Sequence, residues 1–463
     1  MPVDDYYRLQ VALQCEGRVG RFLNQSFGLP GKDSYTFTWA LYPILSSDYY
    51  DFINLVRKDY VPNYTIEGSG AFANYWLPTI WSKQKMADWL KDRAVKIVIL
   101  GGPYGGGPWL GGYGHYTYKV PDDYNLTEYL KEIKKARDII KEIDPGIKCL
   151  APLETPLIDN KPGVIEPGFP DSVRMNAAGN PVLSHFGSEK VKQYIYDPIL
   201  TNSWYKHLKM CIERALKEAE VDGIYFDCFT CGGYTYDRWD NRSVDMNLDN
   251  YTIKKKKAET TELTEDARVD LVKTALSYKK GNVVVVNGMG MTDKIRNLPI
   301  FHFSEAAKDS DYIASHLSTP IILGWTPGYS PLPDKPWQKE WKTDKNYFED
   351  IKDKLKNGCL YYTYWAPGGV WGSNLTYPTI LSHMFPITIE EIHSGWIKGI
   401  ERIITLHSGT YTWGDKGDVK CYFYDEEGKE CQGIFKKIEK GKVNSFEIEV
   451  PENGATVIEK KED

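Results

Sequence analysis

Short apolar runs that alternate with amphipathic helical stretches are the feature that most constrains this fold. The run at 95–100 follows a helical stretch at 82–93, and the run at 283–288 follows another at 267–277. Strands that alternate with helices in this way form a parallel sheet. We therefore predict an α/β fold, a (β/α)8 TIM barrel. Its predicted strands are 35–42, 95–100, 147–154, 221–227, 283–288, 300–305, 320–325 and 359–365.

The pattern changes after residue 386. Short strands are predicted at 401–405, 411–413, 419–424 and 445–450, with turn residues and no helix between them, which is typical of an antiparallel β-sandwich. The expected domains are an N-terminal extension at 1–33, a catalytic barrel at 34–385 and a C-terminal β-sandwich at 386–463. In the extension, residues 7–13 alternate like a strand. We interpret them either as an edge strand or as the remnant of a further module.

Charge and hydropathy exclude several classes of partner. The net charge is -6, which gives no electrostatic case for binding nucleic acid or an anionic membrane. The one basic run, 254–257, lies beside acidic residues, and we interpret it as a solvated loop or the start of a helix. No run reaches the roughly 18 apolar residues of a membrane span, and residues 1–5 lack the features of a signal peptide. Cytoplasmic and extracellular locations both stay open, and so does the oligomeric state.

The eight cysteines are widely scattered, and only Cys228 and Cys231 form a close pair. Without a second such pair or a histidine at zinc-finger spacing, we predict no metal site. The glycine-rich stretch 101–118 lacks a phosphate-binding motif, so no organic cofactor is expected. Cys421 and Cys431 are predicted as neighbours in a hairpin that form a disulfide. Abundant Lys and Glu with scarce Gln lead to the hypothesis of a thermophilic source.

Asp227 ends the predicted strand 221–227. A carboxylate at the end of a buried strand is costly unless it is paired or functional, and in a barrel the carboxyl ends of the strands form the active-site rim. We therefore predict that Asp227 is a catalytic nucleophile. The structural alternative is a carboxylate bonded to backbone amides. Asp222, before the strand, is interpreted as a turn residue.

Glu305 ends the predicted sixth strand, on the same rim as Asp227. Two carboxyl groups suit glycoside hydrolysis, in which one attacks the anomeric carbon and the other, protonated, donates to the leaving oxygen. Apolar neighbours favour the protonated form that a general acid needs. A retaining enzyme would hold the two groups about 5–5.5 Å apart, and an inverting one about 6.5–9.5 Å apart. A purely structural role for Glu305 is the alternative.

Further residues near strand ends are candidates for binding the substrate. Carboxylate, amide and imidazole groups bind sugar hydroxyls, and aromatic rings stack on sugar faces; among 33 Tyr and 14 Trp, core packing is the alternative. For the histidine, a purely structural role within its strand is the alternative. Glu154 is expected to orient the substrate or to support the nucleophile. The predicted substrate-binding residues are Glu154, Tyr225, Asn287, His302, Trp325 and Trp365.

Two segments carry a family resemblance. Residues 202–227, ending in Ile-Tyr-Phe-Asp, resemble the strand-four region of retaining α-glycosidases of the clan that includes α-galactosidases, and of related hydrolases of the endo-α-polygalactosaminidase type. Residues 390–405 resemble the barrel-to-sandwich junction of such proteins. The resemblance implies a strand-four nucleophile at Asp227 and a strand-six acid/base at Glu305, where the clan usually has Asp.

The sequence thus predicts a glycoside hydrolase, retaining and α-specific, that acts on an oligo- or polysaccharide. The alternative is a catalytically inactive barrel that serves as a carbohydrate-binding or cell-surface structural protein. A barrel enzyme of non-glycosidic chemistry is a further alternative.

Overall fold

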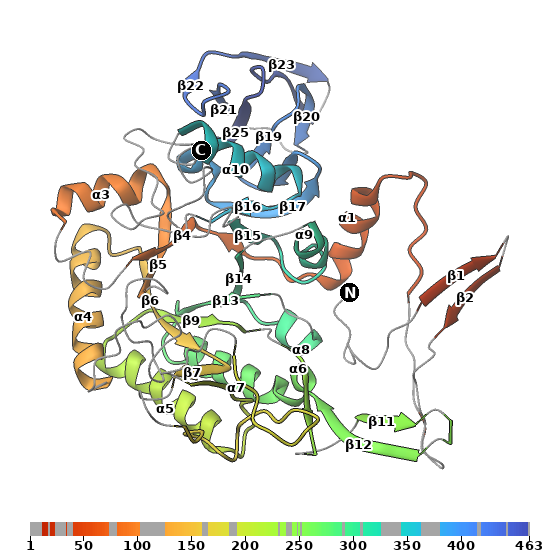
Figure 1. Ribbon diagram of the computed structural model, residues 1–463. Helices are drawn as coiled ribbons and strands as arrows, with labels where there is room; N and C mark the ends of the chain where they lie inside the picture. The colour runs from red at the N-terminus through yellow and green to blue at the C-terminus, as the bar shows by residue number, and fades with distance from the viewer. Residues whose placement is uncertain are drawn as a thin grey trace, which may run out of the picture.

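Eight parallel strands form the central sheet of the protein (Figure 1). The structure is a computed structural model that describes residues 12–16, 19–23, 34, 40–73, 81–101, 126–159, 165–184, 192–229, 232–237, 243–247, 249–250, 252–288, 292–305, 309–325, 344–362, 380–413, 418–440 and 443–461. The sheet order is β16-β15-β14-β13-β9-β6-β5-β4, which follows the chain as a TIM barrel requires. The strands are β4 (Ser69–Ala73), β5 (Val95–Leu100), β6 (Lys148–Glu154), β9 (Gly223–Asp227), β13 (Val283–Asn287), β14 (Phe301–Glu305), β15 (Ile322–Trp325) and β16 (Leu360–Tyr361).

The first barrel strand differs from the sequence prediction. Residues 40–42 form no strand, and 35–39 lie outside the described residues. The first position belongs instead to β4, which pairs in parallel with β5. Its sequence, Ser-Gly-Ala-Phe-Ala, is short and rich in small residues, so it lacks the β-branched pattern that marks a strand. The other strands keep their predicted order, and Asp227 therefore ends the fourth strand.

Helices pack on the outer face of the sheet, where their apolar sides and those of the strands form a large core. Three of the helices begin where a side chain caps a free backbone N–H group. The side chains of Asp48, Ser82 and Asn202 accept hydrogen bonds from backbone N–H groups in the first turns of α1, α3 and α5. The helices are α1 (Tyr49–Tyr60), α3 (Lys83–Asp92), α4 (Leu126–Ile143), α5 (Ser203–Glu218), α6 (Thr260–Leu263), α7 (Glu265–Ser277), α8 (Asp293–Arg296), α9 (Asp309–Ser315), α10 (Asp344–Lys356) and α11 (Leu381–Met384). Among the described helices none is long and apolar enough to span a membrane.

Aromatic rings fill the inside of the barrel. The Phe72 ring meets the Tyr225 ring edge-on at 4.9 Å between centroids, and the Phe303 and Tyr362 centroids lie 4.5 Å apart. Tyr362, just after the last strand, also lies against Gly70 of the first strand, where an added Cβ would be 2.2 Å from its ring. The two end strands are therefore brought together by packing, and the barrel is nearly closed.

Antiparallel sheets make up the C-terminal part. A seven-stranded sheet has the order β22-β21-β25-β19-β18-β17-β3, and a three-stranded sheet has the order β20-β24-β23. Because β3 (Thr65–Ile66) precedes the barrel strands, its pairing with β17 ties the two parts of the chain together. The other strands are β17 (Ile387–His393), β18 (Trp396–Gly399), β19 (Arg402–Thr405), β20 (Gly409–Trp413), β21 (Val419–Tyr424), β22 (Glu430–Cys431), β23 (Ile434–Lys440), β24 (Val443–Glu449) and β25 (Ala455–Lys460).

In the N-terminal extension, β1 (Ala12–Glu16) and β2 (Val19–Leu23) pair with each other in a two-stranded sheet. Within the described residues, β1 therefore pairs with β2 alone. It forms an edge of neither the barrel sheet nor the C-terminal sheets. Most of the predicted strand at 7–13 lies outside the described residues.

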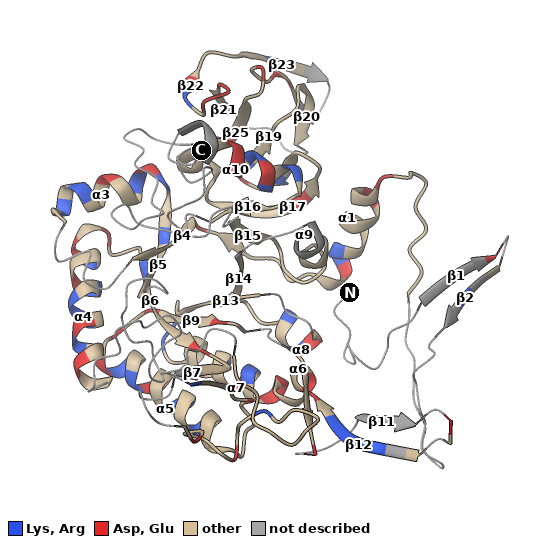
Figure 2. Ribbon diagram, in the orientation of Figure 1, with Lys and Arg blue, Asp and Glu red and all other residues tan. Residues whose placement is uncertain are grey.

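The basic run forms a strand rather than a loop or a helix start. It lies on β12 (Thr252–Glu259), which pairs with β10 (Tyr234–Tyr236) and β11 (Ser243–Asn247) and is marked blue in Figure 2. Lys257 lies over the Tyr234 ring at 4.3 Å from its centroid, and Lys255 lies 3.9 Å from Asp237. Lysine is uncommon in strands, which explains why the sequence pattern did not reveal this one.

The predicted disulfide between Cys421 and Cys431 is absent, because both are free thiols. The hairpin itself is present, but its register places Cys431 opposite Phe423 rather than Cys421. The turn sets this register: Asp425 N–H donates to the Lys429 carbonyl. Burial raises the pKa of the Cys421 thiol to about 12.

Gly223 gives a direct test of how closely the barrel strands approach one another. An added Cβ there would lie 1.7 Å from the carbonyl oxygen of Val283 on the neighbouring strand. Gly223→Ala is expected to lower the free energy of unfolding by about 3 kcal/mol or more, measured by urea denaturation. Gly168→Ala is the matched control: nothing lies within 4 Å of its added Cβ, so a change within about 0.5 kcal/mol is expected. Equal stabilities of the two variants would contradict the strand packing.

Candidate active site

Asp227 lies at the carboxyl end of β9 and is only 5% exposed. Tyr225 Oη donates to its Oδ1 at 3.0 Å, and Asn287 Nδ2 donates to the same oxygen at 2.7 Å. No described residue donates a hydrogen bond to the second oxygen, Oδ2. The carboxylate is therefore held from one side. The predicted structural alternative, bonding to backbone amides, finds no support among the described residues.

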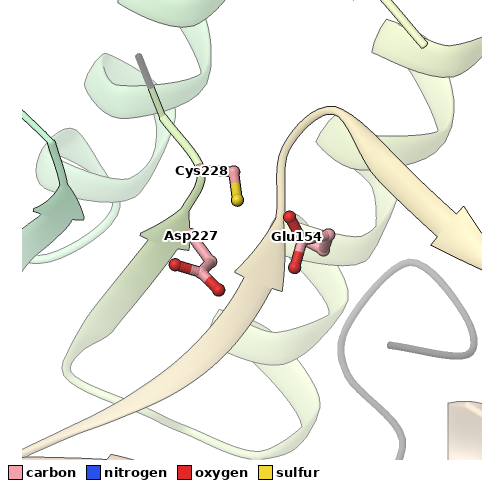
Figure 3. Close-up of side chains that lie close together, drawn as sticks. All are labelled: Glu154, Asp227 and Cys228. Carbon is pink, nitrogen blue, oxygen red and sulfur yellow. The ribbon is translucent and has the colours of Figure 1, made fainter. Parts of the chain in front are cut away.

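Glu154 lies beside Asp227, at the end of the neighbouring strand β6 (Figure 3). The two residues are paired in the parallel register. Their nearest ligand oxygens, together with the Cys228 sulfur, lie within 4.8 Å of one another. Glu154 is 2% exposed. Among the described side chains, the carboxylate next to Asp227 is therefore that of Glu154, which the sequence predicts to orient the substrate or to support the nucleophile.

The chain turns sharply directly after Asp227. Cys228 has φ +49°, a conformation that is uncommon for a residue other than glycine. Phe229 N–H then donates to the Asn287 carbonyl at 3.1 Å, which fixes the turn to β13. The turn brings the Cys228 thiol next to the two carboxylates (Figure 3).

Glu154, Asp227 and Cys228 offer the carboxylate and thiolate atoms that zinc prefers. In the described part of the chain, they form one group of three potential ligands close enough to share an ion. The sequence prediction of no metal rested on the absence of a second CxxC pair and did not consider this group.

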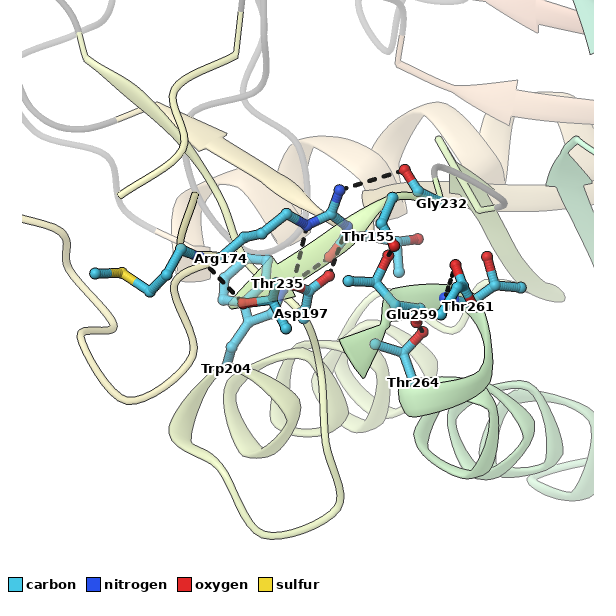
Figure 4. Close-up of polar contacts among 12 residues, drawn as sticks. Thr155, Arg174, Asp197, Trp204, Gly232, Thr235, Glu259, Thr261 and Thr264 are labelled. Carbon is cyan, nitrogen blue, oxygen red and sulfur yellow. Dashed lines mark hydrogen bonds and ion pairs between the residues drawn. The ribbon is translucent and has the colours of Figure 1, made fainter. Parts of the chain in front are cut away.

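The segment that follows β6 is anchored by a buried ion pair (Figure 4). Arg174 donates from Nε and Nη2 to the two oxygens of Asp197, at 3.0 and 2.6 Å, and the side chains are 7% and 1% exposed. Next to Glu154, the Thr155 carbonyl accepts from Trp204 Nε1 at 2.8 Å. The sequence gives no signal for this ion pair, because its two residues lie in a long stretch without periodicity.

His302 is 1% exposed, and burial lowers its pKa to about 4. The ring is therefore neutral near pH 7, and its Nδ1–H donates to the Gly288 carbonyl at 2.9 Å. Gly288 N–H in turn donates to the Phe303 carbonyl. These bonds fix the chain directly after Asn287. The expected contact of His302 with a sugar hydroxyl stays a prediction.

The other predicted site residues are only partly described. Glu305 ends β14, and its backbone is in register with Trp325 of β15, but the side chains of both lie outside the described residues. Trp365 and the glycine-rich stretch 102–118 lie outside them as well. The expected distance between Asp227 and Glu305 therefore stays a prediction. Asp222, interpreted as a turn residue, lies in a bend, where it accepts from Cys149 N–H and pairs with Lys141 at 2.8 Å.

No known family matches the chain in a comparison with family profiles, and no curated protein sequence matches it either. Among solved structures, a glycoside hydrolase family 31 dextranase from Flavobacterium johnsoniae, complexed with glucose, is 11% identical over 90% of this chain and 55% of its own, with a TM-score of 0.44. A cycloisomaltooligosaccharide glucanotransferase from Paenibacillus sp. is 11% identical over 86% and 55%, with a TM-score of 0.36.

A third solved structure, a noncanonic maltogenic α-amylase from Thermotoga neapolitana, is 11% identical over 85% of this chain and 98% of its own, with a TM-score of 0.42. The chain spans about half the length of the first two proteins. At these low TM-scores, none of the three likenesses carries an activity over to this chain. The resemblance of residues 202–227 to the α-galactosidase clan stays a prediction.

The buried ion pair gives a second test of stability. Asp197→Ala leaves the Arg174 charge buried without its partner, so the free energy of unfolding is expected to fall by about 3–5 kcal/mol in urea denaturation. The control is Glu142→Ala, which breaks the exposed pair of Glu142 with Lys83 and is expected to cost no more than about 1 kcal/mol. An Asp197 variant as stable as this control would contradict the assigned role.

Proposed function

We propose that the protein is a glycoside hydrolase that cleaves O-glycosidic bonds of an oligo- or polysaccharide with retention and α-specificity. Asp227 is the nucleophile, and Glu305 is the general acid/base. The observation that carries the proposal is the Asp227 carboxylate at the carboxyl end of the fourth strand, with one oxygen held by two donors and the other without a donor among the described residues. Barrel enzymes place catalytic groups at this end of the strands.

The identity of the donors supports catalysis over a purely structural role. An Arg partner would neutralise a structural carboxylate, and several backbone amides would donate hydrogen bonds to both of its oxygens. The described donors to Asp227 are instead two uncharged side chains, Tyr225 and Asn287, so its negative charge is not paired with a cation there. An uncompensated carboxylate suits attack on an anomeric carbon that becomes positively charged.

The chemistry proceeds in two displacements. First, a lone pair of Asp227 forms a bond to the anomeric carbon while the glycosidic C–O bond breaks and the leaving oxygen takes the proton of Glu305. Glu305 then removes a proton from water, whose oxygen attacks the anomeric carbon and releases the carboxylate of Asp227. The strand position of Glu305 supports its role: its backbone ends β14, the sixth strand of the barrel, at the end of the strands where barrel enzymes place catalytic groups.

Glu154 is the second candidate for the acid/base role, because its carboxylate lies close to that of Asp227. The family resemblance, which implies an acid/base on the sixth strand, favours Glu305 for this role instead. We assign Glu154 to shaping the site around the nucleophile.

Kinetics with aryl glycosides separate these roles. The wild type is screened on p-nitrophenyl α- and β-glycosides and on polysaccharides, and the anomer first released is followed by NMR. Asp227→Asn is expected to lower kcat by about 10³-fold or more on every substrate. Glu305→Gln is expected to lose about 10²–10⁴-fold on phenyl glycosides, which need protonation, and far less on 2,4-dinitrophenyl glycosides, which do not.

Glu154→Gln is the matched carboxyl control, and its losses should not depend on the leaving group. A leaving-group dependence in Glu154→Gln but not in Glu305→Gln would transfer the acid/base role to Glu154. Activity that survives Asp227→Asn unchanged would contradict the proposal. Carbohydrate binding without turnover by the wild type would favour the inactive carbohydrate-binding alternative.

A further inference from the structure

Tyr225 and Asn287 both donate to one oxygen of Asp227, and this asymmetry identifies the reacting atom. Tyr225 Oη lies 3.0 Å and Asn287 Nδ2 2.7 Å from Oδ1. An oxygen that accepts two hydrogen bonds has less electron density to give, whereas Oδ2 accepts none from the described residues. We infer that Oδ2 attacks the anomeric carbon and that Tyr225 and Asn287 are positioning residues that hold Oδ1. The inference rests on the proposed nucleophilic role of Asp227.

Packing holds the Tyr225 side chain in one position. It lies two residues before Asp227 on the same strand, so both side chains are on the face that lines the barrel interior. Its ring is 1% exposed and packs edge-on against Phe72 at 4.9 Å. The hydroxyl is thus held at a fixed point, where it contacts Asp227. The substrate-binding role predicted for this residue stays a prediction.

Asn287 holds the nucleophile in two ways. Its side-chain amide donates to Asp227 Oδ1, and its backbone carbonyl accepts from Phe229 N–H, two residues after the nucleophile. The residue after it, Gly288, is fixed in turn by His302 and Phe303. A chain of bonds from the interior of β14 therefore sets the position of the Asn287 amide, and through it the direction of the carboxylate.

Holding Oδ1 also stabilises the first intermediate. When the Oδ2–carbon bond forms, the carboxylate becomes an ester, and Oδ1 becomes its carbonyl oxygen. The same two donors then hold that carbonyl oxygen. When water displaces the sugar, Asp227 becomes a carboxylate again, and the two donors hold the same oxygen as before. Positioning of this kind lowers the barrier of the chemical step and leaves ground-state binding of the sugar almost unchanged.

The test compares kcat with KM on a 2,4-dinitrophenyl glycoside that the wild type hydrolyses. Asn287→Ala and Tyr225→Phe each remove one donor, and each is expected to lower kcat about 10- to 100-fold with KM within about twofold of wild type. Asn287→Leu keeps about the size of the side chain and removes the donating amide without adding a charge beside Asp227, so it should lose kcat as well. A space-filling role would leave its kcat intact.

Two matched control variants remove an Asn amide and a Tyr hydroxyl that do not contact Asp227. Asn282, directly before β13, donates from Nδ2 to the Ala275 carbonyl, and Tyr205 donates from Oη to Asp270 on α7, outside the barrel. Asn282→Ala and Tyr205→Phe are expected to keep the kcat of the wild type. Tyr225→Phe retains the packing against Phe72, so it gives an answer even where Asn287→Ala fails to fold.

The outcomes separate the inference from the proposed function. A raised KM with unchanged kcat in the Asn287 and Tyr225 variants would overturn the inference and make both residues sugar ligands, while the loss in Asp227→Asn would still support the nucleophile. Unchanged kcat in Asp227→Asn would overturn both. Loss of kcat in the two controls to the same extent would also overturn the inference, because the effect would then be general destabilisation.

Discussion

The hydrogen bond from Asn287 to Asp227 is the interaction on which the candidate site depends. It joins the carboxyl ends of two adjacent parallel strands, β9 and β13, and it holds a charge that is 5% exposed. A buried carboxylate is tolerated only where donors replace water. The two donors do so at one oxygen, Oδ1, and no described residue donates to the other. In the proposed function, the first oxygen is held in place and the second is the one that reacts.

The barrel interior makes this arrangement possible. Its aromatic rings form a packed floor beneath the carboxyl ends of the strands, and they fit because Gly70 has no side chain where Tyr362 lies. Gly223 similarly allows β9 to approach β13 at the start of the strand that ends in Asp227. Tyr225 belongs both to this floor and to the site. The Asp227 carboxylate is therefore positioned by the same packing that stabilises the fold.

Much of the fold could be predicted from the sequence, because apolar strands such as β5 and β13 have clear patterns. The glycine-rich strand β4 and the lysine-rich strand β12 could not, since packing and pairing with neighbours override their low strand propensity. In the site, Asp227 was predictable as a charge at the end of a buried strand. Its neighbours Glu154, Tyr225 and Asn287 were predicted near strand ends, but their contacts with Asp227 were not, because these depend on the register between strands that are far apart in sequence.

Trapping the covalent intermediate tests most directly whether Asp227 is the nucleophile. A 2-deoxy-2-fluoro glycosyl fluoride of the sugar that the wild type hydrolyses slows breakdown of the glycosyl-enzyme, so that intact-mass spectrometry and peptide sequencing can locate the adduct. We expect one sugar per chain, attached to the peptide that contains Asp227, and no adduct in Asp227→Asn. An adduct on Glu154 or Glu305, or turnover with inversion and no adduct, would contradict the role of Asp227 as the nucleophile.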